Sequence, residues 1–152
     1  MKIAVSACLL GHPCRYDGGS KPHAGVIEAT KGHEILPICP EVAGGLPIPH
    51  PACEITSDSP LRVCDADGED VTEAFVHGAM TTLEAMRDSD CALAILKAKS
   101  PSCGTGKIYN GSFTGTLRDG WGVAAALIRD AGIPCMDETQ IDELPSYLAG
   151  AR

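Results

Sequence analysis

The stretch KIAVSACLLGHPCRYDGG, residues 2–19, joins a short apolar run to a loop rich in reactive side chains. Lys2–Val5 has the composition of a buried strand, and after Ser6 the chain soon breaks into Gly, Pro and Asp. Open α/β sheets build their active sites at the carboxyl ends of strands, where loops of this kind begin. The stretch therefore predicts a first strand that opens directly into a functional loop.

Two later stretches repeat this arrangement. ILPICPE, residues 35–41, and LAILKAKSPSCG, residues 93–104, each contain an apolar run followed within a few residues by a cysteine close to a proline. The carboxyl ends of parallel strands meet at one edge of a sheet. We therefore expect the three loops to converge and to form a functional site there.

The rest of the chain alternates helical and strand-like patterns. Helices are predicted over residues 24–31, 71–89, 122–130 and 141–148, and further strands over 33–38, 91–96 and 133–136. This alternation favours a three-layer αβα architecture with a mostly parallel sheet. The 152 residues are long enough for a single domain, 1–152, with its own core.

Three segments carry more specific expectations. Residues 91–96 are apolar throughout and should form a central strand. Residues 39–60 are so rich in Pro and Gly that we expect a long loop, followed by a short extended piece at 61–64. Residues 104–120 should form turns or a small hairpin.

The charge and hydropathy patterns exclude two classes of partner. Twenty acidic residues against twelve basic ones give a net charge of -8, which argues against binding to a nucleic-acid backbone. No apolar run reaches the roughly 18 residues of a membrane span, and the chain starts in a strand rather than in a signal peptide. We expect a cytoplasmic protein whose thiols stay reduced.

Eight cysteines are many for such a protein, and no two of them have the Cys-x-x-Cys spacing. Cys91 and Cys135 lie in or at strand-like runs and are interpreted as core residues, whereas Cys53 and Cys64 have no clear assignment. The remaining four lie in the predicted strand-end loops: Cys8, Cys14, Cys39 and Cys103. They are either small loop residues or thiolate ligands for zinc or an iron–sulfur cluster.

Several polar residues near these cysteines suit catalysis or binding. Glu41 follows Cys39 closely and is a candidate general acid or base. Ser100 and Ser102 flank a proline before Cys103, where a hydroxyl can position water or cap a turn. CGTGK, residues 103–107, lacks the pattern of a nucleotide-binding loop. Local positive charge is available from Arg15, Lys97, Lys99 and Lys107.

With these residues in view, the chain resembles a bacterial family long known as a domain of unknown function, which includes the TudS-like thiouracil desulfidases. The matching stretches are SACLLGHPCRYDGGSK, CPEVAGGLPIP, GEDVTEAFVHGA, LKAKSPSCGTGKIYNGSFTGTL and GWGVAAALIRDAGI. They follow one another in order over nearly the whole chain. The combination of SACLLG, CRYDG and SPSCG is highly specific.

The resemblance implies a [4Fe-4S] cluster that is held by three cysteines and leaves one iron open. Matched by position, the ligands are Cys8, Cys39 and Cys103, with Cys14 as an alternative ligand or a functional thiol. The open iron would bind the sulfur of a thiocarbonyl group, and water would attack the carbon without net redox change. The implied enzyme is a hydrolase or lyase that acts on a thiolated pyrimidine.

The resemblance also implies roles for residues around the cluster. Glu41 would be the acid or base, and Ser100 would help to place the attacking water. The substrate-binding candidates that lie in the matching stretches are Arg15, Asp17, Ser102 and Gly104.

The sequence departs from the family pattern at two positions. The pattern has an arginine where this chain has His50, and an aspartate where it has Asn110. A histidine weakens a bidentate contact and makes the local charge depend on pH. These departures bear on the substrate more than on the cluster.

Two other functions are compatible with the same cysteines. One is a cysteine-based metal-binding or sulfur-handling protein without catalysis, with zinc in the site. The other is a thiol redox enzyme that uses Cys8 and Cys14 as a dithiol pair, although the missing Cys-x-x-Cys spacing counts against it. The sequence leaves the oligomeric state open.

Overall fold

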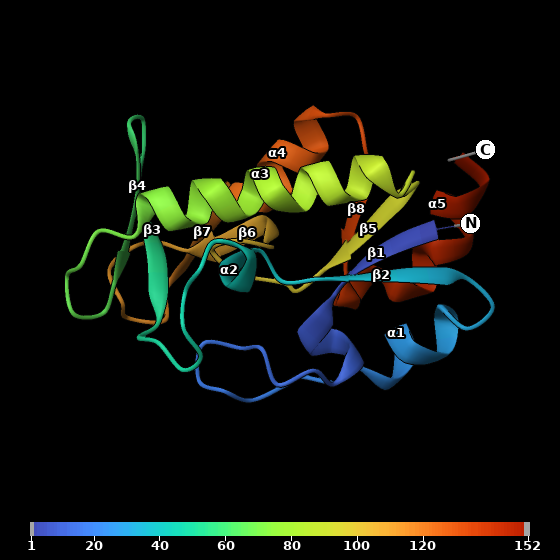
Figure 1. The fold of residues 1–152 in the computed structure, drawn as a ribbon, viewed down its shortest axis with the longest axis horizontal. Helices are drawn as coiled ribbons and strands as arrows, with labels where there is room; N and C mark the ends of the chain where they lie inside the picture. The colour runs from blue at the N-terminus through green and yellow to red at the C-terminus, as the bar shows by residue number, and fades with distance from the viewer. Residues whose placement is uncertain (1, 151–152) are drawn as a thin grey trace.

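A four-stranded parallel sheet forms the centre of the computed structural model, which describes residues 2–150. Its strands lie in the order β2 (Glu34–Ile38), β1 (Lys2–Ser6), β5 (Leu93–Leu96) and β8 (Cys135–Asp137) (Figure 1). β5 is flanked by strands on both sides and is fully buried, so the expectation of a central strand over 91–96 is confirmed. β8 begins two residues later than the predicted segment 133–136.

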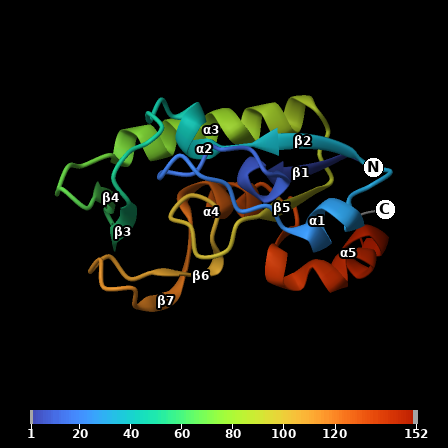
Figure 2. The same ribbon diagram turned by 90° about the horizontal axis from the view of Figure 1, so that it is seen from below.

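Helices cover both faces of this sheet, and the predicted α/β fold class is confirmed. α3 (Thr72–Asp88) and α4 (Val123–Asp130) lie on one face, and α1 (Ala24–Ala29) and α5 (Leu144–Gly150) lie on the other (Figures 1 and 2). A short 3-10 helix, η2 (Glu138–Glu143), precedes α5. Within residues 2–150, no helix is both long and apolar enough to cross a membrane.

The side chains of each central strand point alternately toward these two helical layers. Ala4 of β1 faces the cluster that contains Met86 of α3, whereas Ile3 and Val5 face the cluster that contains Val26 of α1. Side chains of a strand point to opposite faces in turn, so a strand covered on both sides must be apolar at every position. This requirement explains why the apolar runs of the sequence marked the strands.

Two hairpins extend beyond the strand ends. β6 (Thr105–Tyr109) pairs with β7 (Leu117–Trp121), which confirms the hairpin expected within 104–120. β3 (Cys53–Asp58) pairs with β4 (Leu61–Asp65), and a one-turn helix, α2 (Pro40–Ala43), follows β2. The prediction of an irregular loop over 39–60 is therefore wrong. Only Cys53 and Ile55 of β3 pack into the apolar cluster around Phe75. Two apolar residues in a proline-rich segment are too few to predict a strand.

α2 sits unusually close to α3, and two glycines allow this. A Cβ on Gly44 would lie 2.0 Å from the carbonyl oxygen of Ala74, and one on Gly78 would lie 1.9 Å from that of Pro40. Either contact is far below any van der Waals distance, so only glycine fits at both positions. The contact fixes α2, and with it Cys39 and Glu41, against the long helix.

Candidate active site

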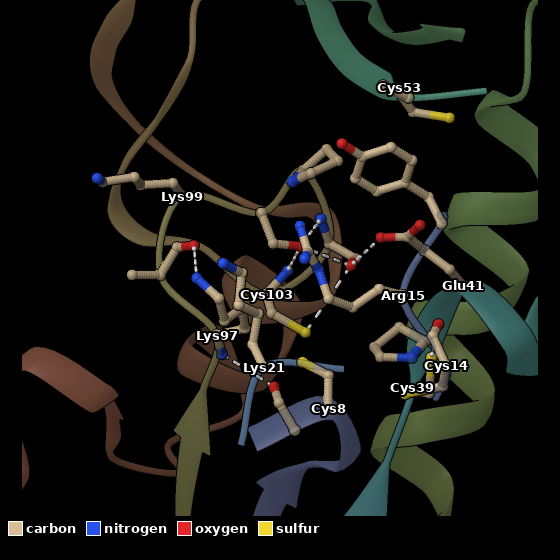
Figure 3. A pocket seen from close by; sticks show the side chains of 18 of the residues that line it. Cys8, Cys14, Arg15, Lys21, Cys39, Glu41, Cys53, Lys97, Lys99 and Cys103 are labelled. Atoms are coloured by element: carbon tan, nitrogen blue, oxygen red, sulfur yellow. Dashed lines mark hydrogen bonds between the residues drawn. The ribbon is translucent and has the colours of Figure 1, made fainter. Parts of the chain in front are cut away.

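A cavity of about 710 Å³ lies at the carboxyl ends of β1, β2 and β5 (Figure 3). Its walls also include the loop after η1 (Ala7–Leu10), the start of α2, the β3 strand and the β6–β7 hairpin. The expected place of the site, where the strand-end loops converge, is the place where the structure has this cavity. Its volume is within the range of small-molecule sites.

Five thiols line the cavity, and three of them follow adjacent strands. Cys8 lies in η1 directly after β1, Cys39 caps α2 directly after β2, and Cys103 lies in the turn after β5. Cys14 comes from the loop after η1, and its carbonyl oxygen is 3.7 Å from the Cys39 sulfur. Figure 3 shows Cys8 beside Cys103 and Cys14 beside Cys39.

The protein environment disfavours free thiolates at this site. Burial raises the pKa of the Cys103 thiol to about 12, and burial together with the neighbouring Cys39 raises that of Cys14 to about 12. Burial also raises the pKa of Cys8, although Lys97 acts in the opposite direction. Reactive redox cysteines have lowered pKa values, so these surroundings do not favour a dithiol enzyme. Gathered thiols of this kind become thiolates when a metal centre binds them.

The chemistry of these donors suits an iron–sulfur cluster, because cysteine thiolates are its usual ligands. Among residues 2–150, no three His, Cys, Asp or Glu side chains are close enough together to hold one metal ion. A tetrahedral zinc site needs such close convergence. A four-iron cluster is wider, so the thiolates that bind its separate irons stand farther apart. The donor set therefore fits the implied cluster.

Glu41 stands at the edge of this thiol group and accepts hydrogen bonds from two side chains. The Ser102 hydroxyl donates to Glu41 Oε2 over 2.9 Å, and His50 Nε2 lies 3.1 Å from Glu41 Oε1. The Ser102 oxygen is also 3.8 Å from the Cys103 sulfur. One hydroxyl thus connects the carboxylate with a candidate ligand.

Ser100 supports this hydroxyl instead of contacting Glu41 through a hydrogen bond of its own. Its Oγ accepts the backbone N–H groups of Ser102 and Cys103 over 3.1 and 3.0 Å. With two donors already directed at this oxygen, its own proton is free to point at Ser102 Oγ, 2.9 Å away. Ser102 is 3% exposed and is the serine next to the candidate acid or base.

The other predicted substrate-binding residues divide into two groups. Arg15 lines the cavity, whereas Asp17 and Gly104 do not belong to its lining. Asp17 accepts a hydrogen bond from the backbone N–H of Gly19 and forms an ion pair with Arg15 over 3.5 Å. The ion pair restrains the Arg15 side chain. The N–H of Gly104 is bonded to the Ser100 carbonyl oxygen over 2.8 Å, so it is not available to a ligand.

Positive charge gathers at the cavity despite the acidic composition of the chain. The lining contains Arg15, Lys21, Lys97 and Lys99. Lys97 pairs with Glu138 over 3.0 Å, and Lys99 points away from the cysteines in Figure 3. Lys107, which we expected to contribute, pairs instead with Asp119 on the exposed face of the β6–β7 hairpin.

The remaining cysteines occupy several environments. Cys91 and Cys135 pack into the core on the α3 side, as predicted. Cys53 lines the cavity on the β3 side, away from the other thiols (Figure 3), and burial raises its pKa to about 12. The Cys64 sulfur lies 3.8 Å from the Thr56 hydroxyl.

The two departures from the family pattern have different consequences. Asn110 Oδ1 accepts the N–H of Ser112 over 3.0 Å, a bond that an aspartate would also accept. The contact of His50 with Glu41 was not predicted from the sequence, because Glu41 precedes His50 by nine residues and lies in α2, whereas His50 lies in the loop that follows. The available signal was the position itself, since an arginine of the pattern can form two parallel hydrogen bonds to a carboxylate.

Comparison with known proteins gives three matches. The family model for 2-thiouracil desulfurase matches residues 3–140. The uncharacterised protein YbbK of Bacillus subtilis (strain 168) is 37% identical over 149 residues, which cover 93% of this chain and 99% of YbbK. A solved structure described as the [4Fe-4S]-dependent thiouracil desulfidase TudS is 44% identical, with a TM-score of 0.89 over 97% of each chain.

Proposed function

Because the chain belongs to the 2-thiouracil desulfurase family, we propose that it is a [4Fe-4S]-dependent enzyme that desulfurates thiouracil or a related small thiocarbonyl compound. The reaction is hydrolytic: water and the C=S group give a C=O group and hydrogen sulfide, and no electron is gained or lost. One observation carries the proposal. Three cysteines at adjacent strand ends share a cavity with a carboxylate that is hydrogen-bonded to a buried serine.

Cys8, Cys39 and Cys103 would hold the cluster, with Cys14 as an alternative ligand or a nearby thiol. Three ligands leave one iron open, and when bound this iron supplies a Lewis acid for the thiocarbonyl sulfur. The strand ends support this assignment, because β2, β1 and β5 are neighbours in the sheet and each presents one of the three thiols.

Glu41 acts as the base that removes a proton from the attacking water. A carboxylate can do so only if it stays in place and keeps an unshared oxygen lone pair toward the cavity. Ser102 on Oε2 and His50 on Oε1 fix its orientation from two sides. Ser100 orients Ser102, so its role is one step removed from the water that we first expected it to place.

The aromatic part of the cavity lining suits a flat heterocycle. Tyr16, Tyr109 and Phe113 make up this part, and aromatic rings of this kind stack on a pyrimidine. The guanidinium carbon of Arg15 lies 5.6 Å from the Tyr16 ring centroid, so its donors are close to one of these rings. Carbonyl and thiocarbonyl groups of a pyrimidine accept such donors.

The hydrolytic step is tested with oxygen-labelled water. Cluster-loaded protein, kept without oxygen, is given 2-thiouracil in H₂¹⁸O, and the uracil is analysed by mass spectrometry. We expect one ¹⁸O in the product and one sulfide released per uracil. Product without label would rule out attack by water.

Glu41→Gln should keep the cluster and lose turnover, because the amide cannot take the proton. We expect the rate to fall by about 10²- to 10⁴-fold at an unchanged iron content. Glu84→Gln, on the exposed side of α3, is the matched control. Full activity in Glu41→Gln would show that another group is the base.

Two other outcomes would favour the alternative functions. Zinc in place of iron after anaerobic loading would favour the metal-binding protein. A trapped Cys8–Cys14 disulfide would favour the thiol redox enzyme.

A further inference from the structure

Both ring nitrogens of His50 face hydrogen-bond acceptors. Nε2 lies 3.1 Å from Glu41 Oε1, and Nδ1 lies 2.7 Å from the carbonyl oxygen of Pro51. A carbonyl and a carboxylate oxygen only accept, so each nitrogen must donate a proton to form its bond. A neutral imidazole carries one N–H, whereas an imidazolium carries two. The geometry therefore matches the protonated ring.

The surroundings of His50 are mostly negative or neutral. Its side chain is 5% exposed. Glu41 of α2 and Asp65 of β4 are the carboxylates that act on it, and the Cys53 thiol of β3 lies 3.8 Å from Nδ1. The Tyr16 ring centroid is 6.2 Å away. The hydrogen bond to Glu41 raises the pKa of His50, and burial opposes this only in part.

We propose that His50 is a positioning residue for Glu41: as an imidazolium anchored to the Pro51 carbonyl, it holds Oε1 while Ser102 holds Oε2. The carboxylate is then fixed at both oxygens and directed at the cavity. When His50 loses its proton, one of its two bonds is lost, and the neutral ring holds Glu41 less firmly. The arginine of the family pattern keeps its positive charge at every working pH. In this chain, the positive charge beside Glu41 is present only while His50 is protonated.

The pairing is tested first without turnover. In cluster-loaded protein labelled with ¹³C at histidine Cε1, the His50 signal is identified by its absence in His50→Gln and His50→Phe, and it is titrated by NMR. We expect its pKa to be lower in Glu41→Gln than in the wild type, because the amide carries no charge. Equal values in the two proteins would overturn the proposal.

The second test is the pH profile of kcat/KM for 2-thiouracil. We expect the wild-type value, relative to that of His50→Arg, to fall as the pH rises through the pKa of His50. His50→Phe should lose about ten- to hundredfold in kcat/KM, and His50→Arg should restore most of the loss. His77→Gln, which changes an exposed histidine of α3, should follow the wild type throughout. Parallel profiles for the wild type and His50→Arg would contradict the proposal.

This inference rests on the proposed function only for the role of Glu41 in catalysis. The two tests separate the possible failures. If the NMR shift occurs but no thiolated pyrimidine is converted, the pairing stands and the proposed reaction is wrong. If turnover occurs but the NMR shift and the pH effect do not, the reaction stands and His50 has no positioning role.

Discussion

Ser102 is the side chain on which the geometry of the candidate base depends most directly. It is almost fully buried and has one acidic partner, to which its hydroxyl donates over 2.9 Å. Hydrogen bonds to a charged group contribute about 1.5–3 kcal/mol. We therefore expect a residue that holds this candidate base in place to affect the rate, although it need not contact the substrate.

Ser102→Ala should lower kcat by roughly 10- to 100-fold while iron binding is retained, because the cysteines keep their positions. The measurement is steady-state turnover of 2-thiouracil with the iron content determined on the same sample. Ser146→Ala on α5 makes the same chemical change at an exposed site and should have no effect. Wild-type turnover in Ser102→Ala would remove this serine from the proposed machinery.

Cys103 and Cys91 flank the same strand at opposite ends and provide a matched pair. Cys103 follows β5 and lines the cavity, whereas Cys91 precedes β5 and packs into the core. Cys103→Ala should abolish cluster binding after anaerobic reconstitution, whereas Cys91→Ala should bind iron normally. Quantitation of iron and acid-labile sulfide decides between them. A full cluster in Cys103→Ala would mean that Cys14 completes the ligand set.

The sequence predicted the place of some of these residues but not the contacts of others. That Cys8, Cys39 and Cys103 line one cavity was predictable, because each follows an apolar run and parallel strands bring such positions together. The contact between His50 and Glu41 was missed because it joins a one-turn helix to an irregular loop, whose path no periodic pattern describes. Ser100 and Ser102 were both noted, but only the folded turn shows which hydroxyl reaches Glu41.

Among the secondary-structure elements, the contact between α2 and α3 is the one that holds part of the candidate site in place. α2 has a single turn and cannot hold its place by its own hydrogen bonds. Gly44 and Gly78 let it lie directly on α3, so a long helix supports the segment that bears Cys39 and Glu41. β3 was missed for a related reason, because its support also comes from the neighbouring elements rather than from its own pattern.

Gly78→Ala should therefore destabilise the protein and impair the site together. In an exposed helix the same change would stabilise by up to about 1 kcal/mol, but here the methyl group meets the Pro40 carbonyl. Overpacking of this kind costs about 1–3 kcal/mol. We expect a thermal midpoint lower by several degrees and a reduced iron content, measured anaerobically. Thr81→Ala, on the exposed face of α3, is the control; a Gly78→Ala protein as stable as this control would refute the account of the contact.

At the scale of the whole molecule, the order of the strands creates the site. β1 lies between β2 and β5, so three loops from distant parts of the sequence open side by side. The sheet was predictable because strands buried on both faces leave continuous apolar runs in the sequence. The walls of the cavity were not, since the β3–β4 and β6–β7 hairpins are positioned by tertiary contacts that local patterns do not encode.

The central claim is that this cavity holds a cluster and uses it to desulfurate a thiolated pyrimidine. Its most direct test is the amount of uracil and sulfide formed from 2-thiouracil by anaerobically reconstituted wild-type protein of known iron content. The account predicts about four irons per chain, with uracil and sulfide formed in equal amounts over many turnovers. A fully loaded protein that forms neither product from 2-thiouracil would contradict it.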